Sequence, residues 1–231
     1  MISVCIATYN GEKYVSEQIR SILSQTKPVH EIVVSDNCST DRTIEILRSF
    51  EDERIKIFTF EHKDVSLNFE NALQKSKGEY IFLSDQDDIW AENKVEVMLN
   101  EAQKSDLVIS NAMLFNESGE IGDWFTLRGS TKGVLTNLMR FSFLGCCFLI
   151  KRDLLLRCFP FPPHKTLVSH DNWLYVNAAL KGKVSIIDNC LVKYRRHSLN
   201  VSGGITSTRS QWQRVLYRFK LYYFYANTLR R

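Results

Sequence analysis

The sequence predicts an α/β fold of the doubly wound type, built on a mostly parallel sheet. Short apolar stretches alternate with segments whose apolar residues recur every three or four positions. The stretch that ends at Ser84 is apolar almost throughout, which is typical of a central strand buried on both faces. With 231 residues, of which 44% are hydrophobic, the chain is long enough to bury a substantial core.

The predicted elements of the first half follow one another regularly. Val15, Ile19 and Ile22 share one helical face, as do Phe69, Ala72 and Leu73 farther along. In chain order we expect a strand at 2–7, a helix at 14–25, a strand at 31–35, a helix that carries Ile44, Leu47 and Phe50, a strand at 55–60, a helix around Phe69, a strand that ends at 85, a helix at 95–102 and a strand at 107–114. Ser39, Thr40 and Asp41 have side chains that cap helix N-termini, so they are expected to begin the second helix.

The second half is less regular. We expect a strand at 144–150, a helix at 171–180, short strands at 184–187 and 191–195, and an amphipathic helix at 212–229. No linker rich in Pro or Gly interrupts the chain, which favours one continuous domain over residues 1–205 followed by a helical tail at 206–231.

The positive charge is concentrated near the end of the sequence. The net charge is +4, yet no acidic residue follows Asp188. The basic residues after it are Lys193, Arg195, Arg196, Arg209, Arg214, Arg218, Lys220, Arg230 and Arg231. This asymmetry indicates an anionic partner for the last helix, such as a membrane surface, although the helix could instead pack on a partner or on its own core. No nucleic-acid-binding motif is present, so we expect no nucleic acid partner.

The six cysteines form no Cys-x-x-Cys pair, so the sequence gives no support for a zinc site or thioredoxin chemistry. The first residues lead directly into a strand pattern without a signal-like segment. The most apolar run, residues 141–150, is too short to span a bilayer. We therefore expect a protein of a reducing, cytoplasmic compartment.

Three carboxylates follow the buried strand directly, at Asp85, Asp87 and Asp88. Ligands of open α/β sheets gather at the carboxyl ends of the strands. Carboxylate oxygens there can hold a hard divalent cation whose remaining ligands are phosphates, which predicts a site for a nucleotide diphosphate. The alternative is a polar turn, but neighbouring carboxylates repel one another unless a cation offsets them.

Several short motifs resemble glycosyltransferase family 2. They are Ala7-Thr8-Tyr9-Asn10, the stretch from Val34 to Asp41, Asp85-Gln86-Asp87-Asp88-Ile89-Trp90, His170-Asp171-Asn172-Trp173 and Tyr194-Arg195-Arg196-His197. The third is most similar to bacterial rhamnosyltransferase-type members, and the match spans about residues 1–203. The resemblance implies a GT-A fold, with a nucleotide-binding half at about 1–115 and an acceptor-binding half at about 116–205. It also implies a nucleotide-sugar donor, a divalent metal and inversion at the anomeric carbon.

The resemblance also assigns roles to individual residues. It places Thr8, Tyr9, Asn10, Asp36, Asn68, Asp85 and Gln86 at the nucleotide-sugar. Asp36 would accept from a pyrimidine N–H, and Asp85 would face the ribose. Asp87 and His197 would bind Mn²⁺ or Mg²⁺, for which carboxylate and imidazole are suitable ligands. From the residues alone, the cluster around Asp36 could equally be a set of helix caps and turns, and His197 could be a structural histidine.

Asp171 is the expected general base, because direct sugar transfer needs a carboxylate that takes the proton of the attacking hydroxyl. The alternative is an N-cap role for the helix that follows. Gly145, Cys146 and His170 would lie near the acceptor by resemblance, and His170 stands where the family commonly has Glu. Trp90, Trp124 and Trp173 are either sugar-stacking or packing residues.

Together these features predict a metal-dependent inverting glycosyltransferase of bacterial surface polysaccharide synthesis. The motif favours a dTDP-L-rhamnose donor, and UDP-sugars remain open. The acceptor would be a glycan or a lipid-linked glycan, and we expect the basic helix to meet the inner face of the cell membrane. Two rival hypotheses are a nucleotidyltransferase, which would need a Gly-rich loop after the first strand, and a non-catalytic binding protein, which would not need Asp85, Asp87 and Asp171 together.

Overall fold

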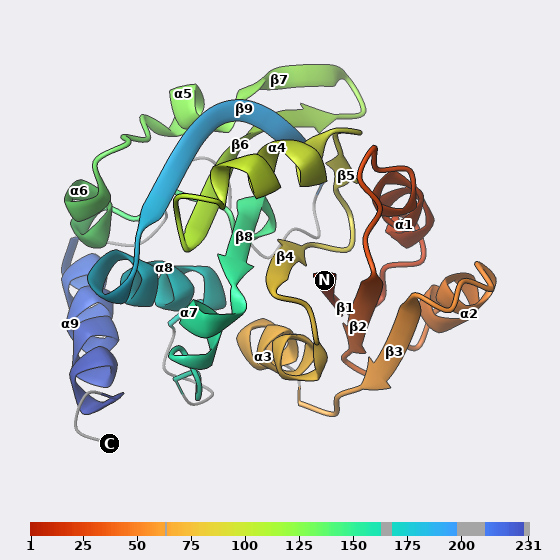
Figure 1. Ribbon diagram of the computed structural model, residues 1–231, viewed down its shortest axis with the longest axis horizontal. Coiled ribbons are helices and arrows are strands. Elements are labelled where there is room, and N and C mark those ends of the chain that lie inside the picture. Colours follow the sequence, from red (N-terminus) through yellow and green to blue (C-terminus); the bar gives the residue numbers. More distant parts are fainter. Residues whose placement is uncertain (63, 163–167, 198–210, 229–231) are drawn as a thin grey trace.

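A curved sheet with helices on its faces forms the body of the protein (Figure 1). The computed structural model describes residues 1–62, 64–162, 168–197 and 211–228. Within these ranges the strands are β1 (Ile2–Thr8), β2 (Glu31–Asp36), β3 (Ile55–Thr59), β4 (Tyr80–Ser84), β5 (Ile89–Trp90), β6 (Leu107–Asn116), β7 (Gly119–Asp123), β8 (Phe148–Lys151) and β9 (Val184–Arg195). The helices are α1 (Val15–Leu23), α2 (Thr43–Arg48), α3 (Val65–Lys75), α4 (Lys94–Glu101), α5 (Trp124–Arg128), α6 (Val134–Met139), α7 (Arg152–Leu156), α8 (His170–Lys181) and α9 (Gln211–Thr228). The predicted α/β class is confirmed.

The first half of the chain forms a parallel sheet in the order β3-β2-β1-β4. Every residue of β2 is buried, because its neighbours and the helices cover both faces. Thr8 of β1 pairs with Asp36 of β2, and Ile6 of β1 pairs with Ser84 of β4. The carboxyl ends of these strands therefore lie along one edge, where the polar motifs follow.

The second half extends the sheet with mixed directions. β8 runs antiparallel between β4 and β6, and β9 lies beside β6 in parallel. The far end of β9 also pairs antiparallel with β5, so β9 arches across the molecule (Figure 1). The two short strands predicted at 184–187 and 191–195 are thus one strand. Its residues 188–190 are exposed, and the register of its pairing with β6 shifts around Asn111.

Helices pack on the sheet through the apolar faces that the sequence indicates. α3 packs on β1 and β2 through Phe69, Ala72 and Leu73, all fully buried. In α1 the buried residues Val15, Ile19 and Ile22 recur at helical spacing and contribute to the same core. Burial of these faces supplies the main favourable term in folding.

Some predicted boundaries and roles were wrong. Residues 145–147 form a 3₁₀ turn, η1 (Gly145–Cys147), so the strand expected at 144–150 begins only at Phe148. Arg42, not residues 39–41, occupies the N-cap position of α2, although the Asp41 carboxylate accepts the Thr43 backbone N–H at 3.0 Å. The sequence pattern did not predict β5, β7 or the short helices α5, α6 and α7, most of which have fewer residues than a clear period requires.

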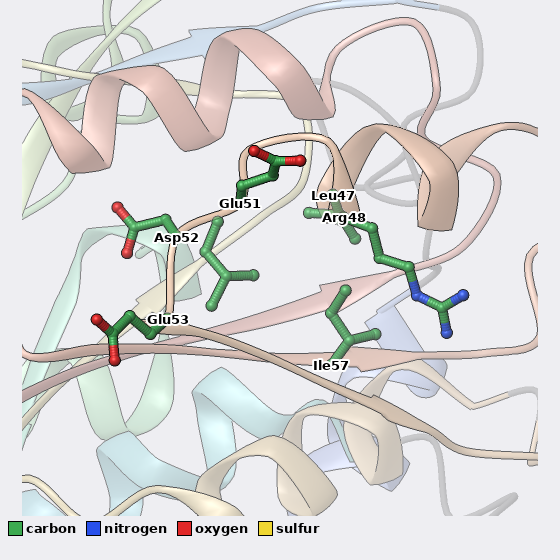
Figure 2. A pocket seen from close by; sticks show the side chains of 7 residues that line it. Leu47, Arg48, Glu51, Asp52, Glu53 and Ile57 are labelled. Carbon is green, nitrogen blue, oxygen red and sulfur yellow. The ribbon is translucent and has the colours of Figure 1, made fainter.

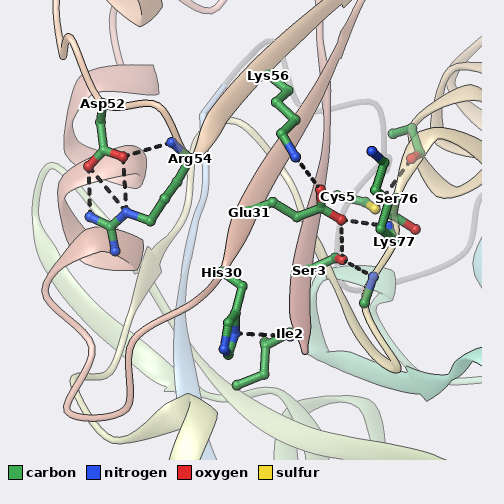
Figure 3. A network of polar contacts seen from close by, with 12 residues as sticks. Ile2, Ser3, Cys5, His30, Glu31, Asp52, Arg54, Lys56, Ser76 and Lys77 are labelled. Carbon is green, nitrogen blue, oxygen red and sulfur yellow. Dashed lines mark hydrogen bonds and ion pairs between the residues drawn. The ribbon is translucent and has the colours of Figure 1, made fainter.

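A buried carboxylate joins the strands at the opposite, amino end of the sheet (Figure 3). Glu31 begins β2, and its side chain is fully buried. It accepts from the Ser3 hydroxyl at 2.6 Å, the Lys56 ammonium at 2.7 Å and the Lys77 backbone N–H at 2.5 Å. Glu31 therefore ties β1, β2, β3 and the segment before β4 to one another.

The terminal helix α9 packs on the domain through one face only. Leu221 is fully buried, and the Tyr217 hydroxyl accepts from the Asn172 side chain of α8 at 2.9 Å. The Tyr222 hydroxyl donates to the Leu138 carbonyl of α6 at 2.7 Å. The large apolar side chains of α9 that remain exposed are Trp212, Val215, Leu216, Phe219 and Tyr223. The predicted domain boundary at 205/206 and the predicted helix end at Leu229 lie outside the described residues.

Candidate functional site

The ends of β1 and β2 form a hydrogen-bonded floor at the carboxyl edge of the sheet. Asp36 is buried and accepts from the Thr8 hydroxyl at 2.7 Å. It also accepts from the backbone N–H of Ser39 at 2.7 Å and from the Ser39 hydroxyl at 2.6 Å. The structure thus brings Thr8 and Asp36 together, and Asp36 closes the loop that follows β2.

Gln86 holds the loop after β1 against the loop after β4. Its side chain accepts from the Tyr9 N–H at 2.9 Å and donates to the Tyr9 carbonyl at 3.1 Å. A Cβ on Gly11 would lie 2.5 Å from the Gln86 Oε1 atom, so any larger residue at this position would displace the Gln86 amide. Asn10 has a positive φ of 47°, and its side-chain oxygen accepts from the Thr40 N–H at 2.9 Å. Tyr9, by contrast, is 45% exposed at the open edge.

Asn68 reaches the same edge from helix α3. The side chain is buried and its Nδ2 donates to the Thr8 carbonyl at 3.3 Å. Its Oδ1 is buried without a hydrogen-bond partner among the described residues. Because an unpaired buried acceptor costs free energy, Asn68 is suited to receive a donor group from a bound molecule.

Three carboxylates, Asp85, Asp87 and Asp88, form what we call the acidic rim. Enclosure by the protein, together with the charges of Asp87 and Asp171, raises the pKa of Asp85 to about 7. Burial and the charges of Asp87 and Asp85 also raise the pKa of Asp88 well above its usual range. The Asp88 Oδ2 atom is buried and has no hydrogen-bond partner among the described residues. Ionisation of Asp85 and Asp88 is therefore disfavoured unless positive charge is added beside them.

His197 completes this arrangement from the end of β9. Its Nε2 lies 2.7 Å from Asp87 Oδ2, and both side chains are largely buried. Arg195 fixes the approach of the strand, because its backbone N–H donates to Asp88 at 3.0 Å and its Nε donates to the Asp87 carbonyl at 2.9 Å. The guanidinium also pairs with Glu17 of α1 at 2.5 Å.

The acidic rim and His197 fit a hard divalent cation. Oxygen ligands from Asp87 combined with one imidazole suit Mn²⁺ or Mg²⁺. The unpartnered Asp88 oxygen and the raised pKa of Asp85 indicate a place where added positive charge is favourable. Ligand atoms of Asp85, Asp88 and Cys146 also lie within 4.8 Å of one another.

The opposite wall comes from η1 and the start of α8. A Cβ on Gly145 would lie 2.8 Å from His170 Nε2 and 3.2 Å from Asp171 Cβ, so only glycine fits without a shift. The His170 ring stacks on Phe69 with 4.1 Å between ring centroids, and burial lowers its pKa. Cys146 is fully buried, and its carbonyl accepts from Lys94 at 2.7 Å. Gly145, His170 and Asp171 are thus neighbours.

Asp171 is not the N-cap of α8. Ser169 holds that position, while Asp171 lies in the first turn and accepts the Asn172 N–H at 2.7 Å. Part of its surface is exposed, and its charge contributes to the raised pKa of Asp85 across the site. The carboxylate is therefore available to a bound molecule.

Similarity to known proteins agrees with this geometry. The family described as Glycosyl transferase family 2 matches residues 3–159. The chain belongs to glycosyl transferase family 2. Over 92% of its length it is 29% identical to an Escherichia coli protein named UDP-Glc:alpha-D-GlcNAc-diphosphoundecaprenol beta-1,3-glucosyltransferase WfgD, of which the match covers 84%. Over 94% it is 28% identical to the dTDP-rhamnosyl transferase RfbG of Shigella flexneri, of which the match covers 80%.

The fold of this family 2 member is GT-A, as expected. The structure of S. aureus TarS 1-349 in complex with UDP-GlcNAc superposes with a TM-score of 0.70 and 22% identity. The match covers 90% of this chain and 61% of that one. The protein is therefore a glycosyltransferase, and the polar edge described above is its candidate active site.

Other parts of the described surface do not qualify as this site. The hollow in Figure 2 lies beside the end of α2 and the start of β3, toward the amino ends of the parallel strands. Its lining residues are Leu47, Arg48, Glu51, Asp52, Glu53, Ile55 and Ile57. Trp90, Trp124 and Trp173 are all at most 5% exposed, which favours packing over sugar stacking.

Lys94 and Arg195 have no role among the residues predicted from the sequence. Arg195 lies inside the Tyr-Arg-Arg-His motif, two residues before His197, and this proximity is a sequence signal for a place in the site. Lys94 precedes Val95 and shares the buried face of α4 with Met98. A lysine on the apolar face of a predicted helix is the signal that indicates a buried cation.

Proposed function

We propose that this glycosyltransferase moves a sugar from a nucleoside diphosphate-sugar to a lipid-linked glycan, with inversion, in bacterial surface polysaccharide synthesis. The observation that carries the proposal is the convergence of Thr8, Asp36, the acidic rim, His197 and Asp171 on one edge of the sheet. In open α/β sheets this edge is where nucleotides bind.

The nucleotide would lie along the loops after β1 and β2. Thr8, Tyr9, Asn10, Asp36, Asn68, Asp85 and Gln86 are the proposed donor-binding residues. The buried, unpartnered Asn68 Oδ1 supports a hydrogen bond from the base. Exposed Tyr9 is suited to cover the base, since its ring is amphipathic.

Asp87 and His197 would hold the divalent cation, with Mn²⁺ or Mg²⁺ equally suited to their chemistry. When bound, such a cation offsets the negative charge that gathers on a departing diphosphate. The protein contributes the fixed orientation of both side chains. Arg195, two residues before His197, donates hydrogen bonds to the Asp88 carboxylate and to the Asp87 carbonyl.

Asp171 would act as general base. Its carboxylate would accept the proton of the acceptor hydroxyl as the oxygen attacks the anomeric carbon from the face opposite the diphosphate. The bond to the diphosphate breaks as the new glycosidic bond forms, so one displacement inverts the configuration. Gly145, Cys146 and His170 would form the wall on which the acceptor lies, with Gly145 leaving room beside the base.

We propose dTDP-L-rhamnose as the donor sugar. The Asp85–Trp90 motif and the similarity to the dTDP-rhamnosyl transferase RfbG support it. A UDP-sugar is the second candidate, since the glucosyltransferase WfgD is named for UDP-Glc and is equally similar. The acceptor in the name of WfgD is a diphosphoundecaprenol-linked sugar, which supports a lipid-linked acceptor here.

A lipid-linked acceptor requires access to a membrane surface. No helix within the described residues is long and apolar enough to cross a bilayer. Helix α9 instead exposes Trp212, Phe219 and Tyr223 on the side away from the domain and contains no acidic residue. Aromatic side chains combined with basic ones suit an interfacial helix on anionic lipid. We propose that α9 rests on the inner face of the cell membrane.

Titration calorimetry with dTDP-L-rhamnose, UDP-glucose and UDP-GlcNAc, each with and without Mn²⁺, tests the donor. We expect the tightest binding for dTDP-L-rhamnose with Mn²⁺, and weaker binding in the Asp87→Asn variant. Preference for a UDP-sugar would replace the donor and keep the reaction class. Absence of binding for every nucleotide in the presence of Mn²⁺ would contradict the proposed function.

A further inference from the structure

Helix α9 lies against the start of α8 and contacts it through a buried tyrosine hydroxyl (Figure 1). The Tyr217 side chain is 8% exposed. Its hydroxyl accepts from the Asn172 side-chain amide at 2.9 Å and from the Ser169 backbone N–H at 3.3 Å. Because Ser169 and Asn172 stand on either side of His170 and Asp171 in the chain, one oxygen atom of α9 bridges the two ends of the turn that carries the proposed base.

Ser169 differs from an ordinary N-cap serine. A serine at this position usually accepts a backbone N–H of the first helical turn. Within the described part of the chain the Ser169 side chain makes no such bond, and its hydroxyl oxygen lies 3.1 Å from that of Tyr217. The start of α8 is therefore held by a contact with α9 in place of the usual local cap.

Asn172 connects this contact to Asp171. The Asn172 side chain is buried and bonded to α9 at both ends, because its Nδ2 donates to the Tyr217 hydroxyl and its Oδ1 accepts from Arg218 at 3.2 Å. The Asn172 backbone N–H donates to Asp171 Oδ1 at 2.7 Å. A short hydrogen bond to a carboxylate is strong enough to orient it. Whatever holds Asn172 in place therefore also orients the Asp171 carboxylate.

A second helix, α3, holds the same turn. Ser66 Oγ accepts from the His170 backbone N–H at 3.1 Å, and the His170 ring stacks on Phe69. Between these two supports Asp171 keeps part of its surface exposed. Loss of the contact with α9 would thus release one side of the turn and leave α3, which also carries Asn68, in place.

We propose that Tyr217 is a positioning residue of the transfer reaction: its hydroxyl fixes the turn at residues 169–172 so that the Asp171 carboxylate meets the acceptor hydroxyl. Helix α9 is then part of the catalytic arrangement as well as a surface for docking. The effect on transfer rests on the proposed function, whereas the hold of Tyr217 on the turn does not. A misplaced base lowers the rate of the chemical step and leaves the donor site unchanged.

Two variants of α9 that each lose one hydroxyl group test the hold on the turn. Tyr217→Phe retains the buried ring, and Tyr222→Phe is the matched control, because the Tyr222 hydroxyl donates to the Leu138 carbonyl of α6 and not to the turn. Hydrogen–deuterium exchange compares the variants with wild type without any assay of activity.

We expect Tyr217→Phe to speed amide exchange at residues 169–173 by about 3- to 10-fold, the factor for one lost hydrogen bond, and Tyr222→Phe to stay within about 2-fold of wild type there. Equal acceleration of these amides in the two variants, or none in Tyr217→Phe, would overturn the hold of Tyr217 on the turn.

Single-turnover transfer at saturating donor and acceptor tests the consequence for the reaction. We expect Tyr217→Phe to lower the rate about 10-fold with donor affinity within about 2-fold of wild type, since a small misplacement of a catalytic group slows the chemical step. Tyr222→Phe should change neither quantity. Equal rate losses in the two variants, or a wild-type rate in Tyr217→Phe, would overturn the positioning role. If wild type transfers sugar to no acceptor, the proposed function fails and the positioning role with it, and the exchange experiment still decides whether Tyr217 holds the turn.

Discussion

Asp87 Oδ2 and His197 Nε2 lie 2.7 Å apart although the two residues are separated by 110 positions in the chain. The contact closes the acidic rim with a side chain from the far end of β9. Replacement of His197 by Asn should weaken Mn²⁺ binding by about 10- to 100-fold, the range expected when a group that supports a metal is lost. Calorimetry with Mn²⁺ and nucleotide measures this, with His62→Asn as the control. Unchanged Mn²⁺ affinity would remove His197 from the site.

Asp171→Asn should reduce transfer by about 10²- to 10⁴-fold, the usual contribution of a general base, and leave donor affinity unchanged. The amide retains the shape of the side chain but cannot take the proton. Single-turnover rates and donor titration separate the two effects, and Asp188→Asn, which changes an exposed aspartate, is the control. Near-normal transfer in Asp171→Asn would place the base elsewhere.

Gly145→Ala should impair acceptor use by on the order of 10²-fold, because a methyl group 2.8 Å from His170 Nε2 must push the ring or the turn aside. The test is acceptor KM at saturating donor. The paired variant Gly145→Ala/His170→Ala removes the clash and should recover part of the loss. If the paired variant is worse than His170→Ala alone by the same factor, the methyl group acts on another neighbour, such as Asp171 Cβ at 3.2 Å.

Stability at low pH should depend on Glu31. Burial raises the pKa of Glu31, but hydrogen bonds from Lys56, Ser3 and the Lys77 backbone outweigh it, so the pKa lies below the ordinary 4.5. A carboxyl group whose pKa is lowered by folding stabilises the fold at pH values above its pKa in the unfolded chain. This stabilisation is lost as the pH falls through its pKa in the folded protein.

We therefore expect Glu31→Gln to cost about 2 kcal/mol of unfolding free energy at pH 7, as for a buried bond to a charged group. The difference from wild type should narrow below pH 4.5. Urea unfolding between pH 3 and 7 measures it, with exposed Glu53→Gln as the control. A difference that stays constant across this range would contradict the role of the ionised carboxylate.

Helix α9 allows its two faces to be tested separately. Phe219→Ser on the exposed face should lower binding to anionic liposomes roughly tenfold, since burial of such a side chain contributes about 1.5–3 kcal/mol. Leu221→Ser on the packed face should instead lower stability. Flotation with liposomes and thermal unfolding are the two measurements. Wild-type liposome binding by Phe219→Ser would favour a role in packing against another protein.

Sequence alone was sufficient for the parallel half of the sheet. Each of β1, β2 and β4 contains an apolar run, and the residues that follow these runs were expected to lie at the carboxyl edge of the sheet. β9 was predicted as two strands because its exposed middle, Asp188 to Cys190, breaks the apolar pattern. Its pairing with both β6 and β5 depends on contacts distant in sequence, which periodicity does not encode.

The site residues that stand in motifs at strand and helix ends were predictable from the sequence, whereas those placed by tertiary packing were not. Thr8, Asp36, Asp85, Asp87 and Asp171 stand in motifs at the ends of predicted elements. The burial of Cys146 and the positions of Lys94 and Arg195 follow from tertiary packing. The position of Lys94 in line with the apolar face of α4 indicates burial, but only the structure shows that its ammonium lies over the Trp90 ring.

The separation of Asp87 and His197 also has a consequence for the timing of synthesis. A ribosome adds about 5–20 residues per second, so Asp87 emerges on the order of ten seconds before His197 can reach it. During that interval the first four parallel strands can pair, whereas the contact that closes the acidic rim cannot yet exist. A nascent chain halted in this interval would therefore have the paired strands but not the closed acidic rim.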